Sequence, residues 1–154
     1  MMTLTRRKLL WMSGAAGLFH VLASPAGAAV ALADVAVFRN PGCGCCEAWA
    51  KRMTDAGFAV NITDDPALDQ RRAKLGIPPD LAGCHLSLIG DQVFEGHVPP
   101  EDIIAFLAAK TDALGLAVPG MPVGSPGMET GGEAEAYDVM KIGRDGTRSV
   151  FARH

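Results

Sequence analysis

Apolar side chains along this chain follow two periods, one typical of strands and one typical of helices. Runs of β-branched and aromatic residues bounded by Gly, Pro or Asn predict strands. Apolar residues four positions apart, such as Trp49 and Met53, predict helices that bury one face. In chain order, the patterns predict a strand at 34–39, a helix at 45–56, a strand at 58–62, a helix at 65–75, a strand hairpin at 86–95 and a helix at 99–110.

The segment 116–132 interrupts this alternation. It contains eight Gly or Pro residues and therefore predicts a long loop, a kind of segment that in compact domains is usually functional or disordered. The loop carries two thioether side chains, Met121 and Met128. Beyond it, apolar runs at 137–142 and 147–151 flank a Gly-Arg-Asp-Gly turn and predict a closing hairpin.

Strand, helix and strand followed by a hairpin and a helix is the thioredoxin-like order of elements. It predicts an α/β fold with a mixed sheet flanked by helices, a Pro/Gly/Met-rich loop and a C-terminal hairpin, because parallel strands joined by helices need both sheet faces covered. Residues 34–154 amount to 121 residues, which suffice for one core and one domain.

Residues 1–33 have the order of features that an export signal requires. Basic residues at 6–8 precede an apolar run from about Leu9 to Ala23 and then small residues, with cleavage favoured after Ala33 over Ala28. The adjacent Arg6 and Arg7 resemble the twin-arginine type of signal, which predicts a periplasmic protein. The apolar run is too short for an anchor, so no stable membrane insertion is expected after cleavage.

The charge of the predicted mature chain excludes a nucleic-acid partner. Removal of residues 1–33 takes away three of the 14 basic side chains and none of the 17 acidic ones. The remaining formal net charge is 11 − 17 = −6, with no basic cluster of the kind that phosphate backbones require.

Cys43, Cys45 and Cys46 place three sulfurs within four residues, at a turn that leads into the helix predicted at 45–56. The positive end of that helix favours thiolates. Three interpretations stay open: a structural disulfide such as Cys43–Cys46 or Cys46–Cys84, a redox dithiol made by Cys43 and Cys46, and a metal site. The third sulfur favours the metal site, since it offers competing disulfides to a dithiol but one more ligand to a metal.

The types of ligand then limit which metal the site could bind. Soft sulfur ligands select Cu(I), zinc or iron–sulfur clusters, and zinc would find four tetrahedral ligands in Cys43, Cys46, Cys84 and His85. The loop methionines favour copper, because Cu(I) accepts thioethers and zinc rarely uses them. Zinc is therefore the less favoured alternative.

Two histidines lie beside the later cysteine or beside a predicted helix. His85 follows Cys84 directly, and His97 stands between Gly96 and Val98. Each imidazole could complete a metal site, support a ligand, or satisfy a loop carbonyl. Met121 and Met128 could equally pack against the domain. These four residues are candidates for additional ligands or for supporting contacts.

Four stretches of the sequence carry a family resemblance: Asn-Pro-Gly-Cys-Gly-Cys-Cys at 40–46 with Trp49, Cys84-His85, Glu-Gly-His-Val-Pro at 95–99, and 118–129 with its two methionines. Together they resemble the CopG-type copper-resistance proteins, over essentially all of residues 34–154. The resemblance implies a periplasmic thioredoxin-like fold and a role in copper tolerance. It also implies a copper site, holding one or several cysteine-bridged ions, with Cys43, Cys45, Cys46 and Cys84 as ligands.

The sequence thus favours a copper-binding protein that sequesters or relays Cu(I), with other periplasmic copper-handling proteins as candidate partners. The competing class is an enzyme, a thiol–disulfide or copper oxidoreductase that uses Cys43 and Cys46. Nothing in the sequence requires turnover, and an enzymatic role is the less favoured one.

Overall fold

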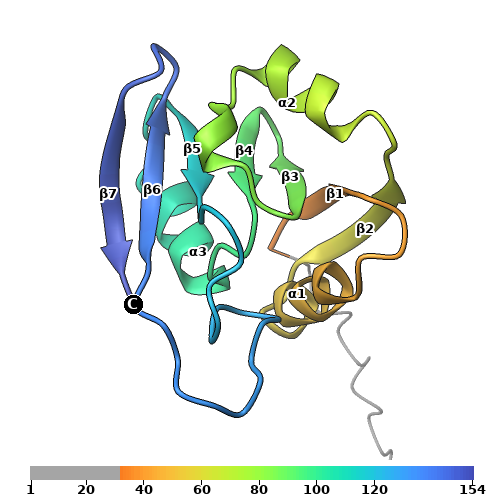
Figure 1. Ribbon diagram of the computed structural model, residues 1–154. Helices are drawn as coiled ribbons and strands as arrows, with labels where there is room; N and C mark the ends of the chain where they lie inside the picture. Colours follow the sequence, from red (N-terminus) through yellow and green to blue (C-terminus); the bar gives the residue numbers. More distant parts are fainter. Residues whose placement is uncertain (1–31) are drawn as a thin grey trace, which may run out of the picture.

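A computed structural model describes residues 32–154 as a seven-stranded sheet with three α-helices (Figure 1). The elements in chain order are β1 (Asp34–Arg39), α1 (Gly44–Asp55), β2 (Ala59–Asp64), α2 (Leu68–Leu75), a 3-10 turn η1 (Pro79–Leu81), β3 (His85–Ile89), β4 (Gln92–Glu95), α3 (Pro100–Ala108), β5 (Ala113–Ala117), β6 (Asp138–Gly143) and β7 (Arg148–Arg153).

The predicted signal peptide falls almost wholly on residues 1–31, which lie outside the described part of the chain. The signal, its cleavage site and the periplasmic destination therefore stay predictions. From residue 32 onward, no helix combines the length and the apolar character that crossing a bilayer requires.

The strand order in the sheet is β2-β1-β3-β4-β5-β6-β7. The β1–β2 and β4–β5 pairs are parallel, and the other four neighbouring pairs are antiparallel. This confirms the predicted α/β class and mixed sheet, and the predicted thioredoxin-like order is compatible with it. The closing hairpin is confirmed as β6 and β7.

The strand β5 was not predicted, because its five residues, Ala-Leu-Gly-Leu-Ala, include no β-branched or aromatic side chain. Pairing with β4 forms it: a Cβ on Gly115 would lie 1.7 Å from the Val93 carbonyl oxygen. The glycine thus allows two backbones to approach closely, which is a tertiary effect. The predicted loop consequently begins after Ala117 and not at Leu116.

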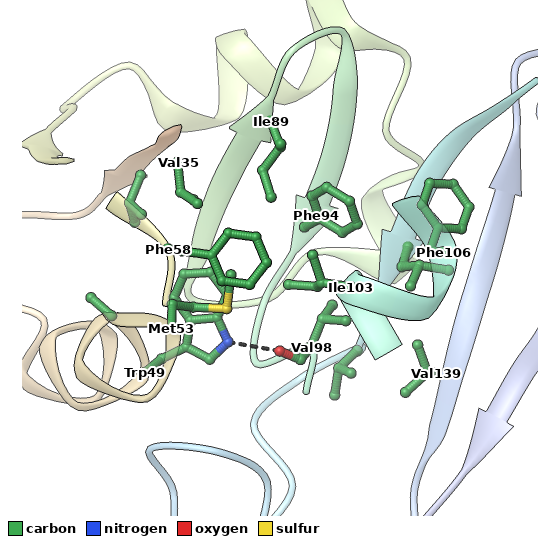
Figure 2. Close-up of a cluster of buried hydrophobic side chains, with 14 residues drawn as sticks. Val35, Trp49, Met53, Phe58, Ile89, Phe94, Val98, Ile103, Phe106 and Val139 are labelled. Carbon is green, nitrogen blue, oxygen red and sulfur yellow. Dashed lines mark hydrogen bonds between the residues drawn. The ribbon is translucent and has the colours of Figure 1, made fainter. Parts of the chain in front are cut away.

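Different helices cover the two faces of the sheet. On one face, α1 and α3 contribute Trp49 and Phe106 to a core that includes Phe94 of β4 (Figure 2). On the other face, Leu68 of α2 packs with Val93, the neighbour of Phe94 in the same strand. Successive residues of β4 therefore point to opposite layers, as the pleat requires. Figure 1 shows α2 at the top, away from α1 and α3.

Trp49 joins α1 to the segment that leads into α3. Its side chain is fully buried, and its indole Nε1–H donates a hydrogen bond of 2.9 Å to the carbonyl oxygen of Val98, drawn dashed in Figure 2. Buried indole N–H groups need such a partner. The contact fixes the cysteine-bearing helix against the segment that carries His97.

The C-terminal hairpin docks on α3 through its ends. Tyr137 stacks on His154 with ring centroids 5.1 Å apart, and His154 Nε2 lies 2.8 Å from an oxygen of Asp102 in α3. Burial and the negative charges of Glu101, Asp102 and Glu129 raise the pKa of the Tyr137 phenol to about 12.

Tyr137 is the only tyrosine in the sequence, so its ionisation can be followed alone by tyrosinate absorbance. We expect a midpoint near pH 12 in the folded protein, and a fall in that midpoint in Glu101→Gln. Because the pKa of Tyr137 in the folded state lies above the ordinary value of about 10, the protonated phenol contributes to the stability of the fold. That contribution is complete below about pH 10 and is lost as the pH rises through about 12.

The matched control for the titration is Glu133→Gln, which removes an exposed acidic side chain from the segment between β5 and β6. This charge is not among those that raise the pKa of Tyr137, so the midpoint should stay unchanged. Circular dichroism at each pH checks that the chain is folded. A wild-type midpoint near pH 10 in folded protein would show that the hairpin does not dock on α3 in this way.

Candidate metal centre

The first three cysteines lie at the N-terminal end of α1. The chain leaves β1, turns through Gly42 with a positive φ of 78°, and enters the helix with Cys43 as the residue before its first turn. Arg39 Nη1 donates a 2.9 Å hydrogen bond to the Cys43 carbonyl oxygen and holds this turn. No side chain of the described residues caps this end of α1, and the positive end of the helix dipole lies at the cysteine turn.

The pairing of β1 with β3 places the fourth cysteine, Cys84, near the other three. Arg39 at the end of β1 pairs with His85 at the start of antiparallel β3. Cys84 therefore comes into the sheet at the same edge at which the cysteine turn leaves it. Cys84, a candidate ligand in both the zinc and the copper interpretations of the sequence, thus lies beside the start of α1.

The four sulfurs form one compact group. Cys43 and Cys46 are joined by a disulfide, and the Cys45 sulfur lies 3.4 Å from that of Cys43 and 3.6 Å from that of Cys84. The Cys46 and Cys84 sulfurs are also 3.6 Å apart. All four ligand atoms lie within 4.8 Å of one another, which is close enough to surround or bridge metal ions.

The disulfide sets the redox state of this group. One of the pairings open from the sequence, Cys43–Cys46, is present, and Cys45 and Cys84 are free thiols. Four thiolates are therefore available only after two-electron reduction of the disulfide. Burial and, next, the neighbouring Cys45 raise the pKa of the Cys84 thiol to about 12, so this sulfur holds its proton until a metal or another cation displaces it.

His97 has its ring orientation fixed by the loop between β5 and β6. Its Nδ1 lies 2.7 Å from the Pro126 carbonyl oxygen, which can only accept, so Nδ1 carries the proton. The unprotonated Nε2 then faces the Cys84 sulfur at 2.7 Å. Burial also lowers the pKa of His97, which keeps the ring neutral and its lone pair available for a metal.

His85 packs between Trp49 and His97, with ring centroids 4.4 and 5.1 Å away. Its Nδ1 lies 3.4 Å from the Cys84 sulfur, and its Nε2 is buried with no hydrogen-bond partner among the described residues. Burial, the neighbouring His97 and the charge of Arg72 hold the pKa of His85 well below its usual range. Cys84, His85 and His97 thus form a second group of ligand atoms that shares the Cys84 sulfur.

The methionine loop crosses the start of α1, where Figure 1 shows the segment between β5 and β6 passing beside the helix. A Cβ on Gly127 would lie 2.6 Å from the Trp49 backbone nitrogen and 3.0 Å from the Cys45 carbonyl oxygen. Met128 is half-buried in this loop, and Met121 is 52% exposed. A ligand role for either thioether stays a prediction.

Two supporting groups were not identified from the sequence. The Pro126 carbonyl is a backbone atom and has no signature in the sequence, although the loop that carries it was singled out. Arg39 was assigned only as the last residue of a strand, whereas its guanidinium also contacts Glu47 in the first turn of α1 at 2.9 Å. Both hold a candidate ligand in place and contribute no ligand atom of their own.

The donor set suits a soft metal. Sulfur dominates, imidazole nitrogen supplements it, and carboxylates do not appear in either group of ligand atoms. Such a set favours Cu(I) or zinc over Mg²⁺ or Ca²⁺, which require oxygen ligands. The structure therefore supports a soft-metal site that forms in full when the Cys43–Cys46 disulfide is reduced.

Comparison with known proteins gives two kinds of match. A family model described as a protein of unknown function, DUF411, matches residues 81–128. Two solved structures of a copper resistance protein CopG, forms 1 and 2, are each 40% identical to this chain, with TM-scores of 0.75 and 0.76. Each match covers 79% of this chain and 97% or 98% of the solved one. No curated protein sequence matches the chain.

Proposed function

This chain belongs to the CopG family of copper resistance proteins, and from that premise we propose that it binds Cu(I) through Cys43, Cys45, Cys46 and Cys84. The observation that carries the proposal is the gathering of four sulfur atoms within 4.8 Å of one another. Sequestration or relay of Cu(I) by these sulfurs would lower the free copper concentration and contribute to copper tolerance.

The surroundings of the sulfurs favour copper over zinc. A structural zinc site is closed by four ligands, whereas here six cysteine and histidine side chains form two overlapping groups that share Cys84. Bridging sulfurs of this kind suit more than one Cu(I) ion. The half-buried Met128 and the exposed Met121 lie on the loop that crosses the site, where thioethers could add to a Cu(I) shell.

The proposal extends to where the protein acts. The twin-arginine-type signal predicted at residues 1–33 would deliver it to the periplasm, where copper is handled outside the cytoplasm. A Cys43–Cys46 disulfide is compatible with an oxidising compartment. Other periplasmic copper-handling proteins are then the candidate donors and acceptors of the metal.

We expect the reduced protein, kept without oxygen, to bind about one or more equivalents of Cu(I), and the oxidised protein to bind markedly less, since its disulfide removes two thiolates. Cys45→Ser should weaken Cu(I) binding by more than the 10- to 100-fold typical of losing an outer partner of a metal ligand. Competition with a calibrated Cu(I) chelator and elemental analysis give both quantities.

The matched control for the copper experiment is Lys51→Gln, which changes an exposed side chain further along α1 and leaves every sulfur and the contacts of Arg39 in place. Its Cu(I) affinity should equal that of the wild type. Failure of the fully reduced wild-type protein to take up copper would refute the proposal, and preferential retention of zinc against excess Cu(I) would assign the site to zinc instead.

The disulfide favours a second candidate function, a copper oxidoreductase. Two Cu(I) ions can each give one electron to the Cys43–Cys46 bond, which breaks into two thiolates and leaves two Cu(II) ions. The free Cys45 thiol 3.4 Å from the Cys43 sulfur offers a further route, by exchange of disulfide partners.

The oxidoreductase candidate predicts a fixed stoichiometry. Oxidised protein mixed with Cu(I) under anaerobic conditions should yield two Cu(II) ions for every two thiols that appear, followed by electron paramagnetic resonance and thiol titration. Cys43→Ser, which cannot form the Cys43–Cys46 bond, should yield neither product through this pair. Copper uptake without any Cu(II) or new thiols would leave sequestration as the function and exclude the redox reaction.

A further inference from the structure

We propose that the buried ion pair between Arg72 and Glu95 positions Cys84, by fixing the backbone of the residue that precedes it. The pair contains no candidate ligand and lies on the α2 side of the sheet, opposite the layer that holds α1 and α3. The inference rests on the proposed function only in that Cys84 is taken as a ligand; the placement of the Cys84 sulfur can be tested without copper.

Arg72 and Glu95 hold each other in a two-pronged contact. Arg72 Nε donates to the two carboxylate oxygens at 3.1 and 3.2 Å, and Nη2 donates to Oε1 at 2.7 Å. The two side chains are 9% and 0% exposed. A planar guanidinium facing a carboxylate in this way has little freedom to rotate.

Both members of the pair also bind Gly83. Its backbone N–H donates to Glu95 Oε1 at 2.7 Å, and its carbonyl oxygen accepts from Arg72 Nη2 at 2.8 Å. The peptide planes before and after Gly83 are therefore both held, and the second of these leads directly to Cys84. Two side chains from α2 and β4 thus determine where the Cys84 backbone begins.

On its other side, Gly83 packs directly against the turn at Gly96. A Cβ on Gly83 would lie 2.6 Å from the Cα of Gly96, so the two turns are in backbone contact. Gly96 in turn precedes His97, whose Nε2 faces the Cys84 sulfur at 2.7 Å. The turn before Cys84 is therefore held between the ion pair and the turn that carries His97.

A gain in folding stability is not a sufficient explanation for a buried Arg72–Glu95 pair. Replacing a buried ion pair by apolar side chains of similar volume is often neutral or stabilising, because the charges no longer need to be desolvated. Here the pair also supplies hydrogen bonds to both backbone groups of one residue, which apolar side chains could not do. Its specific effect should therefore appear in the geometry of Cys84.

The test uses the metal-free oxidised protein, in which Cys45 and Cys84 are the two free thiols. A short pulse of a neutral alkylating reagent, followed by peptide mass spectrometry, gives the reaction rate of each. In the double variant Arg72→Met with Glu95→Leu, we expect Cys84 to react about 5- to 30-fold faster, as for a local opening eased by one or two kcal/mol. Cys45, on α1, should react at the wild-type rate.

Three single variants complete the design. Asp69→Asn is the matched control, since Asp69 is the 95% exposed partner of Arg72 Nη1, and the Cys84 rate should not change. Glu95→Gln removes the charge near Cys84 but keeps an oxygen that can accept from Gly83, so it should raise the Cys84 rate less than Glu95→Ala does. Equal rates in the Gln and Ala variants would mean that charge, and not position, controls Cys84, and would overturn the proposal.

A folded double variant with unchanged Cys84 reactivity would also overturn the proposal, as would an equal rise at Cys45, which would indicate a general loosening. If the double variant fails to fold, the Glu95→Gln and Glu95→Ala pair decides the matter. The outcome is independent of copper: wild-type protein that binds no Cu(I) would refute the proposed function, and the alkylation rates would still measure the positioning of Cys84.

Discussion

Arg39 at the end of β1 lies opposite His85 at the start of β3, and this antiparallel register fixes the distance between two segments far apart in the sequence. The cysteine turn follows the first residue and Cys84 precedes the second, so all four sulfurs meet at one edge of the sheet. A shift of one residue in this register would move every side chain of β3 to the opposite face of the sheet. Leu86 and Ile89 are buried in opposite layers, and a shifted strand would lose both contacts. Their burial therefore fixes the register on which both the core and the cysteine site depend.

Around these sulfurs, buried polar groups are arranged in pairs that leave little freedom. The Pro126 carbonyl fixes the His97 ring, the Val98 carbonyl fixes the Trp49 indole, and Arg72 with Glu95 fixes the turn before Cys84. Buried donors and acceptors are costly without partners, so each contact restricts the backbone segment that provides it. His85 Nε2 is the exception among the described residues, and it lies beside the candidate ligands.

The sequence predicted those features that depend on local patterns. Apolar periodicity identified α1, β3 and β4, and the residue types made Cys84 a candidate ligand together with the three cysteines beside which the structure places it. The strand β5 was missed because it is formed by close pairing with β4 at Gly115 and not by its own side chains. The Arg72–Glu95 pair was missed because its members are 23 residues apart and join only when α2 packs on the sheet.

The oxidation state of the cysteines could not be decided from the sequence either. Spacing permits a Cys43–Cys46 disulfide, a dithiol or a metal site, and these are states of one group of atoms that differ by two electrons and a bound ion. The fold brings the sulfurs together in every case. The redox poise of the surroundings and the supply of metal then determine which state is populated.

The central claim is that the gathered sulfurs are the copper ligands. X-ray absorption at the copper edge of the fully reduced protein, loaded with Cu(I) without oxygen, tests it most directly. The structure predicts a Cu(I) edge whose nearest neighbours are mainly sulfur, with copper scatterers beyond them if sulfurs bridge several ions. A first shell made only of nitrogen or oxygen atoms would contradict the account.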